Sequence, residues 1–296
     1  MKIKWIPSAV CLLFVVVYSL SFSTIHKERL LLYKIRKIPL DDRAALEAFF
    51  RVLILEEGGA YVLFGGKPMA FTAYFDSCGI NIRTARSWHN YSENRIIKNG
   101  WVVWEKYRSL FPSNHFVLEC KPFDKRRSEV CLINIGKFRK TMDENLKDFQ
   151  SLLGPSVTPE FLLKKYQKGN TALFKLLKED HASLGILLGF GLKNSRIFQE
   201  RWVKLGEDPN LAQEIPYKAF LPVAEPYDDS SLDSAFHENN HKKCYKFLRL
   251  PYFLVDKYSQ ETHELQEQYL HQRQEIHERY AHENFLEVTL RSFCDD

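Results

Sequence analysis

The N-terminal segment constrains this chain most, because it is too apolar for an ordinary place in a soluble fold. Residues 6–22 are almost entirely apolar, and Lys2 and Lys4 precede them. Positive charge, then an apolar core, then small polar residues is the layout of a secretory signal peptide. As a helix such a run measures roughly 26 Å, just short of a bilayer's hydrocarbon core. We therefore predict that residues 1–25 direct the chain to or across a membrane.

Two fates of this segment remain open. Ser21 and Ser23 partly match the small residues that precede a cleavage site, which favours a removable signal peptide. An uncleaved single-span anchor is the alternative. Basic residues flank the run on both sides, so they do not decide which side of the membrane each end takes.

The rest of the chain has the length and composition of a globular protein. Residues 26–296 are long enough for a sizeable core, and we expect a single globular region there. The formal net charge is only +5, and 42 Lys and Arg are scattered among 37 Asp and Glu. A nucleic-acid-binding protein more often carries a concentrated basic stripe. We therefore expect no nucleic-acid partner.

Hydrophobic periodicity predicts an α+β fold in which helices dominate. Leu46, Phe49 and Phe50 recur on one helical face, and Gly58 ends that helix. Further helices are expected at 101–110, from Thr141 with Glu144 as a capping box, from Thr158-Pro159 to Gly169, from Asn170, at 183–192 and at 256–291. Two stretches are expected to be irregular, the polar residues 76–99 and the Pro- and acid-rich residues 206–250.

Two antiparallel hairpins complete the predicted fold. In the first, residues 61–64 and 69–75 are expected to be strands. The intervening Gly65-Gly66-Lys67-Pro68 is typical of a turn. Both hairpins are expected to pack against the helices.

The second hairpin is specified more closely. Residues 116–123 and 128–135 flank a polar turn at 124–127. Pairing the strands so that their apolar residues share one face places Cys120 opposite Cys131. This register predicts a disulfide in an oxidising compartment and two buried thiols in a reducing one.

Cysteine usage argues against two common motifs. Five cysteines lie beyond the apolar run, namely Cys78, Cys120, Cys131, Cys244 and Cys294. None forms a C-x-x-C pair, so neither a zinc knuckle nor a thioredoxin-type site is expected.

The Gly189-Phe-Gly191 sequence resembles part of a phosphate-binding loop. A dinucleotide fingerprint needs a third glycine at position 194, where Asn194 stands. The Gly-Lys-Ser/Thr of a P-loop is missing as well. We therefore expect no nucleotide cofactor, and interpret Gly185 and Gly189 as residues that let a helix approach its neighbour closely.

Residues 237–241 match the H-E-x-x-H pattern of zinc hydrolases. On a helix, His237 and His241 would bind Zn²⁺ from one face, and Glu238 would activate the bound water. Two asparagines at 239–240 disfavour a helix interior, and charged residues flank the string as in a solvated segment. We expect no metal or other cofactor here.

The expected C-terminal helix carries a narrow apolar stripe. Tyr258, Leu265, Tyr269, Ile276 and Tyr280 recur at steps of seven and four, close to the period of a straight α-helix. The other faces are polar, so the stripe should be the buried side. It packs either on its own domain or on a second copy or another envelope protein; both alternatives stay open.

Three further segments carry a resemblance. They are EGGAYVLFGGKPM at 57–69, LGILLGFGLKNS at 184–195, and LPYFLVD at 250–256 with the helix at 262–276 that follows it. Together they resemble uncharacterised exported proteins of chlamydia-type intracellular bacteria. The resemblance implies a bacterial cell-envelope or host-facing setting, and it implies no activity and no functional residue.

These patterns favour an exported or membrane-anchored protein with a non-enzymatic binding or structural role in the cell envelope. Its expected partners are the membrane, through residues 1–25, and a protein or second copy, through the C-terminal helix. The alternative is a zinc-dependent hydrolase that uses His237, Glu238 and His241.

Overall fold

The computed structural model describes most of the chain beyond the apolar N-terminal run. The described residues are 26, 28–75, 85–207, 218–219, 248–251, 253–256 and 258–294. The predicted signal peptide or anchor at 1–25 lies outside them. Among the described helices, none combines the length and the apolar character needed to cross a bilayer. The chain divides into two compact units, Met1–Arg43 and Ala44–Asp296.

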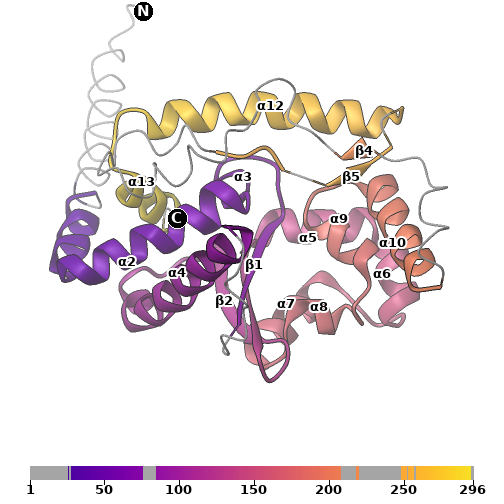
Figure 1. The fold of residues 1–296 in the computed structure, drawn as a ribbon, viewed down its shortest axis with the longest axis horizontal. Coiled ribbons are helices and arrows are strands. Elements are labelled where there is room, and N and C mark those ends of the chain that lie inside the picture. The colour runs from indigo at the N-terminus through magenta and orange to yellow at the C-terminus, as the bar shows by residue number, and fades with distance from the viewer. Residues whose placement is uncertain are drawn as a thin grey trace, which may run out of the picture. The chain divides into compact units, whose positions relative to one another are not determined.

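A three-stranded antiparallel sheet lies in the second unit, among helices (Figure 1). Its strands are β1 (Met69–Phe75), β2 (Phe116–Pro122) and β3 (Arg127–Asn134), in the order β1-β3-β2. All residues from Val130 to Ile133 of the central strand are buried, so both faces of the sheet are covered. The predicted α+β, helix-dominated fold is confirmed.

One face of the sheet packs against helices from the middle of the chain. They are α5 (Ile135–Glu144), α6 (Leu146–Leu153), α7 (Pro159–Lys168), α8 (Leu173–Leu176) and α9 (His181–Leu187). Met69, Cys131 and Ile133 of the sheet join Phe149 and Leu187 of the helices in one apolar cluster. Burial of this cluster is the main hydrophobic contribution to the stability of the fold on that face of the sheet.

Aromatic side chains pack the helices on the other face. The elements that supply them are α2 (Leu40–Arg51), α4 (Ala85–Tyr107) and α13 (Phe285–Cys294). The apolar π-helix η1 (Val52–Glu56) follows α2, and the 3₁₀ turn η2 (Arg108–Leu110) follows α4. The ring of Trp104 lies 5.4 Å from that of Phe50 and 5.6 Å from that of Phe293, both edge to face. Such pairs add to the energy of burial.

The first predicted hairpin is wrong. Residues Gly59–Leu63 form the short helix α3, and β1 pairs with β3 instead, with Met69 opposite Ile133. A run of four apolar residues cannot distinguish a strand from a buried helical turn by periodicity alone.

Gly65 and Gly66 mark a close approach of another helix. A Cβ on Gly65 would lie 2.3 Å from the amide oxygen of Gln272 in α12 (Gln260–Tyr280). The backbone N–H of Gly66 donates to the same oxygen at 3.1 Å. The glycine pair is therefore where α12 rests on the chain between α3 and β1.

The second hairpin forms, but the predicted register is wrong by one residue. Cys120 lies opposite Val130, and Cys131 lies opposite Glu119. Because side chains alternate along a strand, the two thiols point to opposite faces, and neither forms a disulfide. Burial raises the pKa of the Cys131 thiol far above its ordinary value, which makes it an unreactive core residue.

Two features explain the shifted register. The Asp124 carboxylate accepts the backbone N–H groups of Arg126 and Arg127 at 2.7 and 2.9 Å, which closes a tighter turn than expected. Helices also cover both faces of the sheet, so its polar residues need not avoid the main apolar cluster. Glu119 and Lys121 lie on that side and pair with each other at 3.4 Å.

Local capping patterns have mixed outcomes. Thr158 caps α7 as predicted, and its hydroxyl accepts a backbone N–H at 3.1 Å. The predicted capping box is wrong: Thr141 and Glu144 lie in the last turns of α5, which Asn134 caps. Residues 85–99, expected to be irregular, belong to α4.

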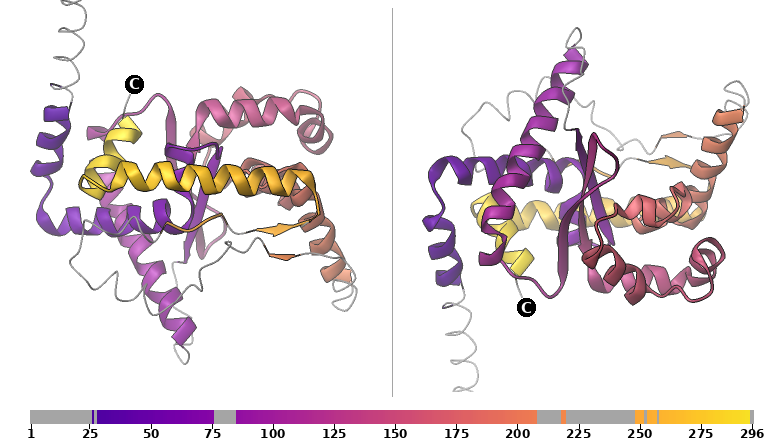
Figure 2. Two further views of the ribbon diagram at one scale, coloured as in Figure 1. Left: turned by 90° about the horizontal axis from the view of Figure 1, so that it is seen from above. Right: turned by 90° about the horizontal axis from the view of Figure 1, so that it is seen from below.

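The long helix predicted at 256–291 is two helices. α12 ends at Tyr280, and α13 begins at Phe285 after a short break. α12 runs past one end of the strands, from α13 on one side to β5 (Leu254–Val255) and α10 (Leu192–Glu207) on the other (Figures 1 and 2). It contacts α3 and α13, and Glu261 near its start contacts the N-terminus of α10.

Most of the segment predicted to be irregular, 206–250, lies outside the described residues. Within it, Lys218–Ala219 forms β4, which pairs with β5. Residues 248–250 have no regular structure, as expected.

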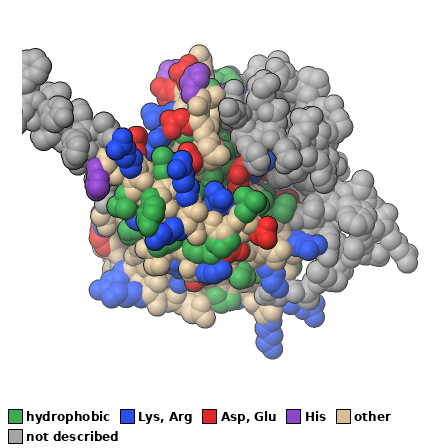
Figure 3. Space-filling view, turned by 90° about the vertical axis from the view of Figure 1, so that its left-hand side faces the viewer, with side chains coloured by type: hydrophobic (Ala, Val, Ile, Leu, Met, Phe, Trp, Pro, Cys, Tyr) green, Lys and Arg blue, Asp and Glu red, His purple; other side chains and the backbone are tan. Residues whose placement is uncertain are grey.

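Surface charge is mixed on the face that Figure 3 draws. Lys and Arg side chains are spread over this face, and acidic and apolar side chains lie between them. This distribution agrees with the small net charge of +5.

Candidate functional site

The residues of the candidate zinc site, His237, Glu238 and His241, lie outside the described part of the chain. Zinc binding and zinc-dependent hydrolysis therefore stay predictions. In the ranges that the structure describes, no group of three or more His, Cys, Asp or Glu side chains is arranged to hold a metal ion.

The Gly189-Phe-Gly191 sequence forms the turn between α9 and α10. Its two glycines have φ angles of 77° and 84°, a left-handed conformation that residues with a Cβ rarely adopt. The turn leaves the first backbone N–H groups of α10 without helical partners. Three of them donate to the carboxylate of Glu261, at 2.9, 2.9 and 3.2 Å.

Glu261 fills a site whose chemistry suits an anion. The N-terminus of a helix combines a partial positive charge with unpaired N–H donors. A Cβ on Gly191 would lie 2.5 Å from the Glu261 carboxyl carbon, so this approach requires glycine. The likeness to a phosphate loop therefore has a physical basis, but the anion comes from the first turn of α12.

Gly185 has the packing role that the sequence predicts. A Cβ there would lie 2.6 Å from the Ser195 hydroxyl oxygen, so α9 and α10 cross closely at this point. Gly189 lies beyond the end of α9, where its carbonyl accepts the Tyr269 hydroxyl of α12 at 2.7 Å.

A groove of about 650 Å³ lies beside this turn, between α5 and α12. Its volume is in the range of small-molecule sites, about 300–1,000 Å³. Its apolar lining includes Pro68, Ile186, Leu192 and Leu265. Its polar lining includes Lys137, Lys140, Thr141 and Glu144 of α5 and Glu261 and Gln268 of α12.

Lys137 is the most perturbed of these polar groups. Its ammonium donates to the Val62 carbonyl at 2.9 Å, and no carboxylate of a described residue lies within ion-pair distance. Burial lowers the pKa of the Lys137 amine to about 8, from an ordinary value of 10.5. The amine is still mostly protonated at pH 7, so it brings positive charge to the groove.

The other charges on the groove have partners within the protein. The Lys140 ammonium lies 3.9 Å from the Glu144 carboxylate, and the Glu261 carboxylate accepts the three N–H groups of α10. Among the described lining residues, Lys137 therefore carries the charge that a ligand would meet.

A second group of ionisable side chains is buried where η1 meets α3. The Glu56 carboxylate lies 3.7 Å from the Arg249 guanidinium, and the Glu57 carboxylate accepts the Thr72 hydroxyl at 3.3 Å. Lys67 donates to the Glu57 carbonyl at 3.3 Å. Burial raises the pKa of the Glu56 carboxyl to about 7, raises that of Glu57, and lowers that of the Lys67 amine. These side chains do not line the groove, and we regard them as part of the folded core.

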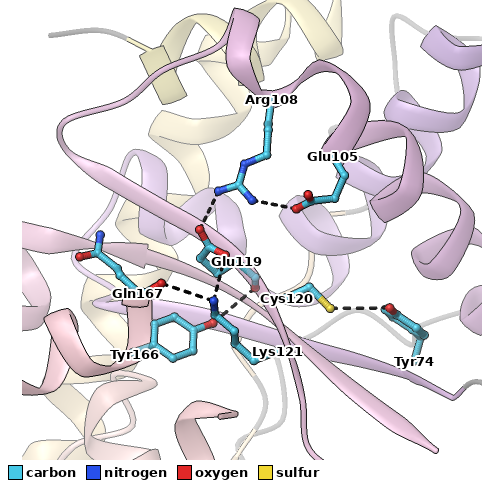
Figure 4. Close-up of polar contacts among 8 residues, drawn as sticks. All are labelled: Tyr74, Glu105, Arg108, Glu119, Cys120, Lys121, Tyr166 and Gln167. Carbon is cyan, nitrogen blue, oxygen red and sulfur yellow. Dashed lines mark hydrogen bonds and ion pairs between the residues drawn. The ribbon is translucent and has the colours of Figure 1, made fainter. Parts of the chain in front are cut away.

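A third polar network holds the edge strand β2 (Figure 4). The Glu119 carboxylate accepts the Arg108 guanidinium at 2.6 Å and pairs with Lys121. On the other face of the strand, the Cys120 sulfur lies 3.7 Å from the Tyr74 hydroxyl oxygen. These contacts give side-chain partners to Glu119, Cys120 and Lys121 of β2, which is one of the two edge strands of this sheet.

Comparisons with known proteins assign no family to this geometry. No protein-family model, curated protein or solved structure matches the chain. The resemblance to exported bacterial proteins stays a hypothesis.

Sequence reasoning singled out the Gly189–Gly191 turn but missed Lys137 and Glu261. Two glycines before a helix are a signal for anion binding, and they point to the place where Glu261 binds. Lys137 has no such signal, because its pKa depends on burial between segments that are distant in sequence.

Proposed function

We propose that this chain is a non-enzymatic binding protein of the cell envelope, exported or held at the membrane by residues 1–25. The groove between α5 and α12 is its binding surface. One observation carries the proposal: Lys137 presents a positive charge beside apolar surface and meets no carboxylate among the described residues. Partial burial strengthens the attraction between such a cation and an anion.

The lining restricts the ligand to an organic anion with an apolar part. Lys137 binds the carboxylate or phosphate group of the ligand, whereas Ile186 and Leu265 contact its apolar part. The Thr141 hydroxyl and the Gln268 amide offer further hydrogen bonds. A single unneutralised lysine favours one negative charge on the ligand.

The envelope setting is supported by the N-terminal sequence and by the resemblance to exported bacterial proteins. Lys2 and Lys4 precede the apolar run at 6–22, as in an export signal. Cell fractionation combined with mass measurement of the mature N-terminus tests this part of the proposal. Full-length protein in the cytosol with Met1 intact would refute it.

Binding of octanoate, followed by titration calorimetry, tests the groove. Octanoate should bind the full-length protein with one site per chain, and uncharged 1-octanol should bind at least about tenfold more weakly. A hydrogen bond to a charged group contributes about 1.5–3 kcal/mol, and each 1.4 kcal/mol is about tenfold in affinity. Equal affinity for the two probes would refute the role of the charge.

Two matched variants locate that charge. Lys137→Met should weaken octanoate binding roughly tenfold or more, because it removes the cation and keeps most of the side chain's length. Lys164→Met makes the same change on the exposed side of α7, away from the groove, and should leave the affinity unchanged. Equal loss in both variants would show a nonspecific effect of net charge.

A further inference from the structure

A separate cavity of about 300 Å³ lies between α9 and α10. Gly189 and Gly191 line the groove, whereas Phe190 between them lines this cavity. Most of the lining is apolar and comes from Leu184, Leu188, Phe190, Phe198 and Phe253. The cavity therefore differs in chemistry from the groove, although both adjoin the same turn.

Contacts within the protein hold the cavity walls in place. The Asn194 side-chain oxygen accepts the Asp256 backbone N–H at 3.0 Å and the Thr262 hydroxyl at 3.1 Å. Its amide group donates to the Phe190 carbonyl at 3.0 Å. The Phe190 ring stacks on the Phe253 ring with centroids 4.3 Å apart. These contacts lie within the protein and fix the positions of the lining side chains, which favours a preformed cavity.

The polar groups of the lining carry no charge at neutral pH. The Asn194 side chain is neutral and makes three hydrogen bonds, and the Ser195 hydroxyl donates to the Gly191 carbonyl. The His181 ring lies 4.6 Å from the Trp202 ring and 4.9 Å from that of Phe174. Burial lowers the pKa of the His181 imidazole below its ordinary 6.5, so the ring is neutral at pH 7.

We propose that this cavity binds one small uncharged molecule with an aromatic or aliphatic body. Its volume is at the lower end of small-molecule sites. An anion would lose its hydration and meet no cation among the described lining residues, which makes charged ligands unfavourable. The His181 ring offers one hydrogen bond at the wall, because no described residue bonds its nitrogens.

A matched pair of fluorescent probes tests the proposal. N-phenyl-1-naphthylamine is uncharged, and 1-anilinonaphthalene-8-sulfonate has the same rings with a sulfonate added. Because the sulfonate is also an organic anion of the kind proposed for the groove, the comparison uses full-length Lys137→Met, in which the groove lacks its cation. In this variant the uncharged probe should bind with one site per chain and at least tenfold more tightly than the sulfonate. Equal affinity of the two probes would indicate generally exposed apolar surface and would overturn the proposal.

Variants place the uncharged probe in the cavity. Leu188→Trp fills the space and should weaken its binding at least tenfold, whereas Leu270→Trp on the exposed side of α12 should not change it. Trp202→Phe should remove most of the energy transfer from protein tryptophan to the probe while the probe still binds. This second readout does not depend on how well the Leu188 variant folds.

Two outcomes separate this cavity from the groove. Lys137→Met and excess octanoate should both leave binding of the uncharged probe unchanged, because Lys137 does not line the cavity. Displacement of the probe by octanoate, or unchanged binding in Leu188→Trp together with undiminished energy transfer in Trp202→Phe, would refute a separate site.

Discussion

The two halves of α12 have different neighbours, although they lie on one continuous helix. In the C-terminal half, Ile276 and Tyr280 are 1% and 2% exposed, and the Tyr280 hydroxyl bonds that of Thr289 in α13. In the N-terminal half, Leu265 lines the groove. Tyr258, which precedes the helix in the same stripe, is 78% exposed. One sequence pattern thus continues from a packed core into the lining of the groove.

The difference shows that a regular apolar period predicts which side of a helix faces the protein, but not how deeply each position is buried. Tyr269 lies at the boundary between the halves. Its ring packs edge to face on Tyr61 at 5.3 Å, and its hydroxyl bonds the Gly189 carbonyl beside the groove. The core half holds α12 in place, and the other half is then free to line a site.

Aspartate substitutions at two positions of the stripe should show the difference between the two halves of α12 most clearly. Ile276→Asp should cost about 4 kcal/mol or more of unfolding free energy, because it removes buried apolar contacts and buries a charge. Leu265→Asp at the partly exposed groove should cost about 1 kcal/mol. Urea unfolding followed by circular dichroism measures both. Equal costs would mean that the two halves are buried alike.

The buried carboxyls of Glu56 and Glu57, outside α12, should make the unfolding free energy depend on pH. The folded-state pKa of Glu56 is raised from 4.5 to about 7, and Glu57 shifts the same way. The folded state therefore holds protons more tightly, and its added stability is complete below pH 4.5 and lost as pH rises through 7. Unfolding free energy should fall by on the order of 2 kcal/mol between pH 5 and pH 8.

Variants of the buried carboxyls check this assignment. Glu56→Gln and Glu57→Gln should each reduce the fall in stability, whereas the exposed Glu264→Gln should not. Urea unfolding at the two pH values measures the effect. A fall that persists in the double variant at Glu56 and Glu57 would place the titrating groups elsewhere.

Glu261→Gln tests how the N-terminal half of α12 is held against α10. The change removes the charge that accepts three N–H groups of α10, and it should cost about 1–2 kcal/mol of unfolding free energy. Glu264→Gln, one turn further along α12, is the matched control and should be nearly neutral. Equal effects of the two changes would show that the α10 contact adds no stability.

Tyr258→Ala should have the smallest effect, within about 0.5 kcal/mol of unfolding free energy, because the side chain is mostly exposed. The same variant examines whether the stripe binds a second copy. Sedimentation of the wild type and the variant should be identical if the stripe packs only on its own domain. If the wild type is a dimer and the substitution dissociates it, the stripe at Tyr258 also binds a second copy.

Local chemistry made part of this fold predictable from the sequence. The α7 helix follows from Thr158 at its start and Gly169 at its end, because capping depends on neighbouring residues. The stripe of α12 follows from its period. The strand partner of β1 did not follow, because it depends on a contact between Met69 and Ile133, which are far apart in sequence.

The candidate site was less predictable than the fold. Its anion contact joins Glu261 to backbone groups nearly 70 residues earlier, and only the glycines at 189 and 191 hinted at it. The shifted register of β2 and β3 has a similar cause, since burial of both faces removes the alternation on which register prediction depends.

We propose that Lys137 supplies the charge that binds an organic anion in the groove. The most direct measurement is the octanoate affinity of the full-length protein from pH 6.5 to pH 9.5, where the ligand stays ionised. Affinity should be constant up to about pH 8 and then fall as the Lys137 amine loses its proton. Lys137→Arg should bind with little change over the same range, because a guanidinium stays charged. An affinity that does not change with pH in the wild type, or an equal fall in Lys137→Arg, would show that Lys137 does not supply the charge.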